Sequence, residues 1–203
     1  MTTPTASSAA RSATTVELRP ATAELARVVS GIDDARLSAP TPCEGLSVGR
    51  LLAHVDGLSV AFADAAAKRG EKLAPEDDVV ADGWRERLPA QLDAMADAWA
   101  APAAWTGQTR IGGTDQSGEM CGLIGLDEVI VHGWDLAAAT GQHYSVPDAL
   151  AEAAARFAGP TAEYHPDGVP GLFGPARAVP EGAGALERLL ALTGRDPDWA
   201  PPA

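Results

Sequence analysis

The chain has 203 residues, which is enough for one domain with a substantial core. Its 15 lysines and arginines stand against 28 aspartates and glutamates, so the formal net charge is −13. A surface this acidic repels the phosphate backbone of nucleic acids and anionic membranes, and neither is an expected partner. Hydrophobic residues make up 46% of the chain and aromatic residues only 5%. Because alanine and leucine are prominent among the hydrophobic residues, the composition favours close-packed helices over sheets.

The distribution of apolar residues predicts neither a membrane protein nor a secreted one. No window of 18 uncharged apolar residues predicts a membrane span. Residues 1–15 are rich in serine, threonine and alanine and lack the apolar centre of a secretory signal, so we expect a disordered tail there. The two cysteines, Cys43 and Cys121, are too few for a disulfide framework. We therefore expect a cytoplasmic, mostly helical protein.

Apolar residues at spacings of three and four predict the helices in chain order. They are expected at residues 20–37, 47–68, 79–100, 118–140 and 147–158, with a short one at 185–192. Ser47 is a natural N-cap for the second helix, and Gly141 ends the fourth. Pro89 is expected to kink or divide the third helix.

The predicted connections complete the domain. Residues 71–78 form a charged linker, and residues 101–117 form a long irregular connection with a short extended piece. Four long helices joined in this way favour a four-helix bundle over residues 16–159. Residues 160–203 are rich in glycine and proline and are expected to wrap over the bundle as part of the same domain.

One histidine lies on an apolar helix face. His54 shares the stripe of Leu51, Leu58 and Phe62 on the second predicted helix. By itself this pattern is also that of a hydrogen-bonded core histidine. His143 and His165 follow helix ends or lie in loops and are expected to be exposed.

The fourth predicted helix carries the partners. Glu128 and His132 are four residues apart and leave the same face, and Asp135 follows His132 by three. An exposed Glu–His pair on a surface helix is the alternative. However, the surrounding residues are almost all apolar, which predicts burial of this helix, and a buried carboxylate needs a charged partner.

These three side chains suit a divalent metal. Two imidazoles and one carboxylate from His54, Glu128 and His132 leave a coordination position for water or substrate, as in catalytic rather than structural zinc sites. Zinc fits this set, and so do Ni²⁺ and Fe²⁺. Cys121, seven residues before Glu128, either borders this pocket or is a small buried hydrophobic residue, and Cys43 has no basic residue near it in sequence and receives no role.

Glycines thin one side of the same helix. Gly118, Gly122 and Gly125 are expected to allow close packing, although they also suit space for a ligand.

Two segments resemble a known family. Residues 41–57, TPCEGLSVGRLLAHVDG, and residues 128–135, EVIVHGWD, resemble the paired signatures of DinB-like proteins. They are most similar to the metal-binding N-terminal domain of mycothiol-dependent maleylpyruvate isomerases. The C-terminal stretches LFGP (172–175) and LLALTGRDP (189–197) resemble the short, single-domain members of that group. Leu46 departs from the pattern, which has tryptophan at the entry to the second helix.

The resemblance implies a fold and a ligand set. The fold is an all-α, up-down-down-up four-helix bundle, here with an extra C-terminal segment. The family's metal ligands fall on His54, Glu128 and His132. The family's aspartate, tied to binding of the thiol cofactor or to support of the histidine, falls on Asp135, which is therefore the expected catalytic and cofactor-binding residue. The isomerase has a further C-terminal domain, whereas residues 160–203 follow the bundle here, so isomerisation of maleylpyruvate itself is not expected.

Several functions are compatible with these residues. In the first, the metal holds a low-molecular-weight thiol as thiolate, with mycothiol implied by the resemblance, for S-transfer to or isomerisation of a small electrophile. In the second, the chain is a non-catalytic metal-binding or stress-related bundle. A third is an Fe²⁺ oxygenase with two histidines and one carboxylate. Hydrolysis is less favoured because Asp135 is the only candidate base beside the metal.

Overall fold

The computed structural model describes residues 15–70, 79–179 and 181–201. The predicted tail, except for its last residue, and the predicted charged linker at 71–78 lie outside the described residues. The α-helices are Arg19–Ser30 (α1), Val48–Ala66 (α2), Trp84–Ala100 (α3), Gly118–Thr140 (α4), Asp148–Tyr164 (α5) and Ala185–Leu192 (α6). Two short 3₁₀ helices are Asp34–Arg36 (η1) and Pro102–Trp105 (η2). The strands are Gln108–Ile111 (β1) and Thr114–Ser117 (β2).

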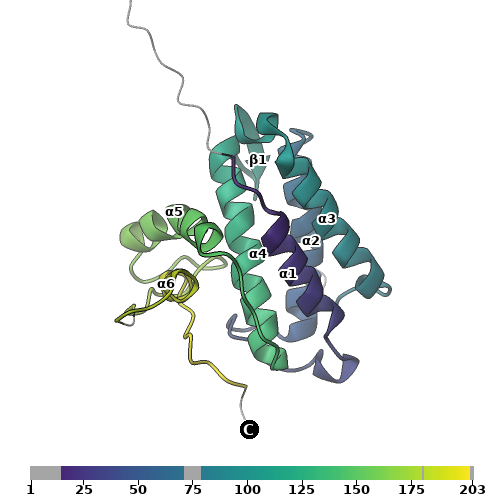
Figure 1. Ribbon diagram of the computed structural model, residues 1–203, viewed down its shortest axis with the longest axis vertical. Coiled ribbons are helices and arrows are strands. Elements are labelled where there is room, and N and C mark those ends of the chain that lie inside the picture. Colours follow the sequence, from purple (N-terminus) through teal and green to yellow (C-terminus); the bar gives the residue numbers. More distant parts are fainter. Residues whose placement is uncertain (1–14, 71–78, 180, 202–203) are drawn as a thin grey trace, which may run out of the picture.

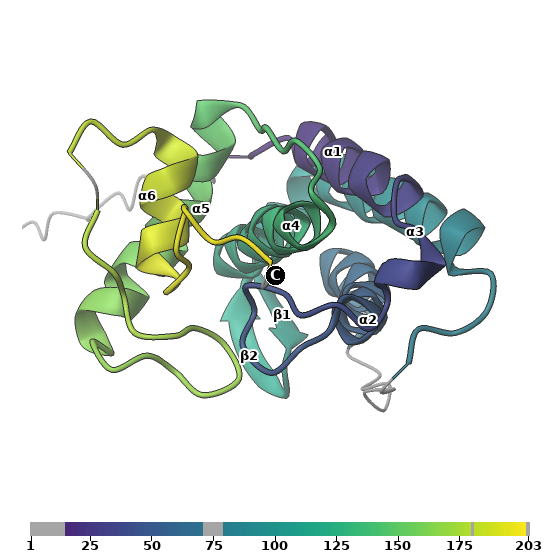
Figure 2. The ribbon, with the colours of Figure 1, turned by 90° about the horizontal axis from the view of Figure 1, so that it is seen from below.

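Four of the helices form one bundle. Helices α1 and α2 each pack against both α3 and α4, so the four enclose a common core (Figures 1 and 2). The apolar stripes of all four helices supply this core, and among its fully buried members are Leu25, Leu52, Phe62, Leu92, Met95, Leu126 and Ile130. The predicted all-α, DinB-like four-helix bundle is confirmed.

Helix α4 is the most enclosed element. It packs against α1 and α2 on one side and α5 on the other (Figure 2). The predicted burial of this helix is therefore confirmed, and its bounds agree with the predicted 118–140. Gly141 ends it with φ of 70°, a left-handed conformation that glycine adopts without a steric cost.

Three predicted helices are shorter in the structure. Helix α2 spans Val48–Ala66 instead of residues 47–68, with Ser47 as its N-cap. Helix α1 ends at Ser30 instead of residue 37, because Gly31 caps it and Asp33 then starts the separate η1 turn by accepting a hydrogen bond from the Ala35 amide at 3.1 Å. Helix α3 begins at Trp84 instead of residue 79, after Gly83 with φ of 74°. Pro89 lies inside α3 without dividing it.

The irregular connection contains a hairpin. Strands β1 and β2 pair in antiparallel register, with Ile111 opposite Thr114. Gly112 and Gly113 both have positive φ, 57° and 74°, as a two-residue type I′ turn requires. This is the short extended piece expected between the third and fourth helices.

The C-terminal part returns to the bundle. Helix α5 packs on α4, and α6 packs on α5 (Figure 1). Helix α5 continues through Pro160 to Tyr164, beyond its predicted end at residue 158, and α6 has its predicted bounds. None of the helices in the described ranges combines the length and the apolar character that a membrane span requires.

Candidate metal centre

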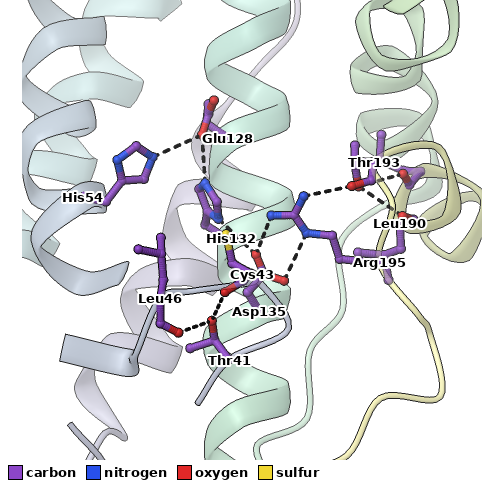
Figure 3. A network of polar contacts seen from close by, with 11 residues as sticks. Thr41, Cys43, Leu46, His54, Glu128, His132, Asp135, Leu190, Thr193 and Arg195 are labelled. Carbon is purple, nitrogen blue, oxygen red and sulfur yellow. Dashed lines mark hydrogen bonds and ion pairs between the residues drawn. The ribbon is translucent and has the colours of Figure 1, made fainter. Parts of the chain in front are cut away.

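The face of α4 toward α2 carries a row of polar side chains. Glu128, His132 and Asp135 follow one another at intervals of about one helical turn, as their spacing requires (Figure 3). Their side chains are 14%, 8% and 0% exposed, respectively. Ionisable groups buried to this extent need partners within the protein, because they have lost most of their contact with water.

Helix α2 brings His54 to the same place. Its Nε2 lies 3.8 Å from Glu128 Oε2, and its ring stands edge-on to the His132 ring with centroids 5.1 Å apart. Glu128 Oε2 is also 3.0 Å from His132 Nε2. The structure thus brings together the three side chains that the sequence analysis named as metal ligands (Figure 3).

The donor set fits a divalent ion. The three ligand atoms of His54, Glu128 and His132 all lie within 4.8 Å of one another. Ligands placed about 2.1 Å from a tetrahedral zinc ion stand about 3.4 Å apart. The two separations that involve Glu128, 3.0 Å to His132 and 3.8 Å to His54, bracket that value.

The second ring nitrogen of His132 is held by Asp135. Nδ1 lies 3.0 Å from Asp135 Oδ2, within hydrogen-bond distance. When Nδ1 carries the proton and donates it to this carboxylate, Nε2 keeps a lone pair directed toward Glu128 and His54. The structure thus places Asp135 against His132, and its supporting role stays a prediction.

The charges of this cluster are strongly coupled. Burial disfavours the Glu128 carboxylate, but its close contacts with His132 and His54 outweigh burial and hold the pKa of Glu128 below its ordinary value. Burial likewise disfavours the His132 cation, but hydrogen bonds to Asp135 and Glu128 raise the pKa of His132 to about 9. The carboxylates around His132 therefore stabilise positive charge on its ring.

Arg195 is part of this network, and no role was predicted for it. It follows α6, is 6% exposed, and makes a two-pronged ion pair with Asp135 (Figure 3). In the sequence, Arg195 lies in the stretch LTGRDP, which is part of the resemblance to the family. That stretch does not indicate which residue the arginine contacts.

The two cysteines have different surroundings. Cys43 lies beside His132 and Asp135, so it belongs to the network even though no role was expected for it (Figure 3). Burial raises the pKa of the Cys43 thiol to about 11, although the positive charge of Arg195 acts in the opposite direction. Cys121 is fully buried in the core, as expected of a small hydrophobic residue. A raised pKa makes Cys43 a poor nucleophile at neutral pH.

One buried carboxyl group remains incompletely paired. Asp127 is 1% exposed, and its Oδ1 has no hydrogen-bond partner. Burial, reinforced by the neighbouring Glu128, raises the pKa of Asp127 well above its ordinary value. The carboxyl group of Asp127 therefore keeps its proton to a higher pH than the neighbouring Glu128 does.

Two cavities flank α4. A narrow crevice of about 10 Å³ reaches Glu128 between apolar residues of α2, α3 and α4, among them Leu58, Phe62 and Met95. A larger cavity of about 220 Å³ lies between α4 and α6, lined by Trp134 and Leu190 among others. None of the three candidate metal ligands lines the larger cavity. Of these two cavities, the crevice is the one that borders the candidate centre, through Glu128.

Comparison with known proteins shows the family of the chain. The family model described as mycothiol maleylpyruvate isomerase N-terminal domain matches residues 18–137. Two proteins of Mycobacterium tuberculosis, from two strains and both described as uncharacterised, are 28% identical over 176 residues, which is 84% of this chain and 91% of theirs.

Solved structures share the fold. Crystal structures of the mycothiol-dependent maleylpyruvate isomerase and of a mutant of it align with TM-scores of 0.51 and 0.53, at 19% and 20% sequence identity. Each alignment covers 72% of this chain and 65% of the isomerase chain. The family model spans more than half of the present sequence and includes all three candidate ligands. The chain belongs to the mycothiol maleylpyruvate isomerase N-terminal domain family.

Proposed function

We propose that the chain binds a divalent metal ion and uses it in a mycothiol-dependent S-transfer or isomerisation of a small electrophile. The ligands are His54 Nε2, Glu128 Oε2 and His132 Nε2, and zinc is the ion that we expect. The observation that carries the proposal is that one ligand atom from each of these side chains, on two different helices, lies within 4.8 Å of the other two. Bound there, the ion supplies the Lewis acidity that keeps a thiol deprotonated at neutral pH.

The residues of the chain divide the work. His54, Glu128 and His132 hold the ion, and Asp135 orients His132 through Nδ1. The side chain of His54 is 29% exposed, whereas that of His132 is 8% exposed, so thiol and electrophile approach from the His54 side. The crevice beside Glu128, at about 10 Å³, is too small to hold a substrate group, so the electrophile binds outside it.

The nucleophile is expected to come from outside the chain. Both cysteines of the protein are unsuited to the task, because the Cys43 thiol has a pKa raised to about 11 and Cys121 is fully buried. An added thiol needs only coordination to become reactive, which is the reason for preferring thiol chemistry to hydrolysis. The family name of the matching model, which includes mycothiol, supports that thiol.

Metal analysis of the purified protein is the first test. We expect about one zinc ion per chain with three protein ligands. His54→Ala should lose the ion, whereas His143→Ala, which removes an exposed histidine away from the centre, should keep it. Equal metal content in wild type and His54→Ala would exclude His54 as a ligand.

Titration with mycothiol is the second test. In the cobalt-substituted protein, mycothiol should produce a sulfur-to-metal charge-transfer band, and an electrophile panel should show metal-dependent consumption of the thiol. A protein that binds the metal but shows neither response would be a non-catalytic metal-binding bundle. Turnover that requires Fe²⁺ and oxygen would instead indicate an oxygenase.

A further inference from the structure

Arg195 meets Asp135 in a geometry that fixes the whole carboxylate. Arg195 Nε lies 3.3 Å from Asp135 Oδ1, and Nη2 lies 3.0 Å from Oδ2. Asp135 is 0% exposed and Arg195 6% exposed, so both groups are shielded from bulk solvent. A guanidinium that binds both oxygens leaves a carboxylate one orientation about its terminal torsion.

The same carboxylate reaches the candidate ligand. Asp135 Oδ2, which accepts from Arg195, also lies 3.0 Å from His132 Nδ1. The orientation of Asp135 therefore sets the plane of the His132 ring and the direction in which Nε2 points. On the other side, Arg195 Nη1 donates to the Thr193 carbonyl at 2.9 Å, and the Thr193 hydroxyl donates to carbonyls of α6.

We propose that Arg195 is a positioning residue of the metal centre, acting on His132 through Asp135. This inference rests on the proposed metal-binding function. It makes the segment after α6 a working part of the centre, although that segment lies outside residues 18–137, which the family model matches. A bundle without this segment would keep its three ligands but would leave a buried Asp135 charge unpaired and free to turn away from His132.

The competing explanation is that Arg195 merely fastens the C-terminal segment. The chain offers a matched control for this, because Arg177 fastens the same segment from another direction. Arg177 Nε donates to the Gly194 carbonyl at 3.0 Å, and Nη1 pairs with Asp196 Oδ2 at 3.2 Å. Its side chain is 53% exposed, and none of its described hydrogen bonds or ion pairs is with Asp135.

The experiment measures the zinc affinity of the full chain by competition with a chromophoric chelator. Loss of a group that orients a metal-bound histidine typically weakens metal binding by about 10–100-fold. We expect a loss of this size for Arg195→Gln and a smaller loss for Arg195→Lys, which keeps the charge but not the fork. Arg177→Gln should stay within about threefold of wild type, since it leaves Asp135 paired.

A double variant covers the case in which Arg195→Gln folds poorly. Asp135→Asn with Arg195→Gln removes both buried charges together and avoids an unpaired carboxylate. If Arg195 acts through Asp135, the double variant should bind zinc as Asp135→Asn alone does, with no additional loss. Additive losses, or equal small losses in Arg195→Gln and Arg177→Gln, would overturn the inference.

The two proposals fail in different ways. If wild type itself binds no stoichiometric zinc, the metal centre and the role of Arg195 fail together. If wild type binds zinc, His54→Ala abolishes binding and Arg195→Gln leaves the affinity unchanged, only the role of Arg195 is refuted.

Discussion

Each ring nitrogen of His132 has its own carboxylate partner. Nε2 lies 3.0 Å from Glu128 and Nδ1 lies 3.0 Å from Asp135, so the ring is held at both ends. His54, in contrast, approaches the cluster from α2 with a more exposed side chain. The candidate centre thus combines one rigid histidine with one that faces the entrance, an arrangement suited to holding an ion while leaving a side open.

Small residues matter nearer the start of α4. A Cβ atom added at Gly122 would lie 2.6 Å from Trp105 Cζ3 and 2.8 Å from Trp99 Cζ3. A Cβ atom added at Gly118 would lie 2.4 Å from the Ala104 carbonyl oxygen, and one added at Gly125 would lie 2.9 Å from Cδ1 of the Phe62 ring. Close packing, rather than space for a ligand, therefore explains these three glycines.

Gly122→Ala should lower the free energy of unfolding by about 1–3 kcal/mol, the usual effect of overpacking a core. Both tryptophan rings are buried and hydrogen-bonded through Nε1, so they cannot move aside without losing those bonds. Chemical denaturation measures the change. Gly57→Ala is the matched control within a helix.

In that control, nothing lies within 4 Å of an added Cβ at Gly57, which is an exposed site inside α2. Replacing glycine there should stabilise the protein by about 0.5–1 kcal/mol, since alanine is the better helix former. A higher free energy of unfolding in both variants would show that the Trp99 and Trp105 rings move to accommodate the added methyl group, and would contradict the prediction for Gly122.

At the scale of elements, α4 joins the structural and chemical parts of the molecule. One face packs on α1 and α2, another on α5, and the same helix carries Glu128, His132 and Asp135. Its start is set locally by Ser117, whose Oγ accepts a hydrogen bond from the Met120 amide at 3.1 Å. The start of α4 is thus specified by a side chain more than one turn away from the candidate centre.

Ser117→Ala should cost about 1 kcal/mol of stability, because an N-cap acceptor is lost. Ser117→Thr keeps a hydroxyl acceptor and suits the end of strand β2, so it should retain most of the stability. Thermal denaturation of the two variants measures the difference, and zinc affinity should be equal in both. A stability loss as large in Ser117→Thr as in Ser117→Ala would argue against capping as the cause.

At the scale of the whole molecule, a net charge of −13 attracts divalent cations non-specifically. Specific binding at the candidate centre must therefore be separated from weak binding to surface carboxylates. The centre differs from the surface in its chemistry, since two imidazoles favour zinc over the hard cations that carboxylates alone prefer.

Zinc at about 100 times its dissociation constant should stabilise the metal-free protein by about 2.7 kcal/mol through mass action. For a chain of this size, that corresponds to a rise in Tm of about 5–10 °C. Magnesium at the same concentration should have little effect. If His54→Ala shows the same rise with zinc as wild type, the stabilisation comes from the acidic surface and not from the centre.

Local spacing was sufficient for much of the molecule. The bounds of α4 and α6, the cap at Ser47 and the shared face of Glu128 and His132 all depend on residues within a turn or two of one another, and all agree with the structure. The end of α1 was misjudged because a glycine cap and an aspartate turn divide a stretch whose apolar spacing continues. The start of α3 was misjudged because residues before Gly83 have helical composition without helical conformation.

Contacts between distant segments required the tertiary structure. His54 faces Glu128 only because α2 packs on α4, and helix periodicity places each residue on a face without stating which faces meet. Arg195 lies 60 residues from Asp135, and Cys43 reaches the same network from the loop before α2. Such pairings depend on how the helices and the C-terminal segment pack around α4. The partner of a buried charged side chain is therefore decided by the packing, because burial removes water from both groups and leaves each as the other's partner.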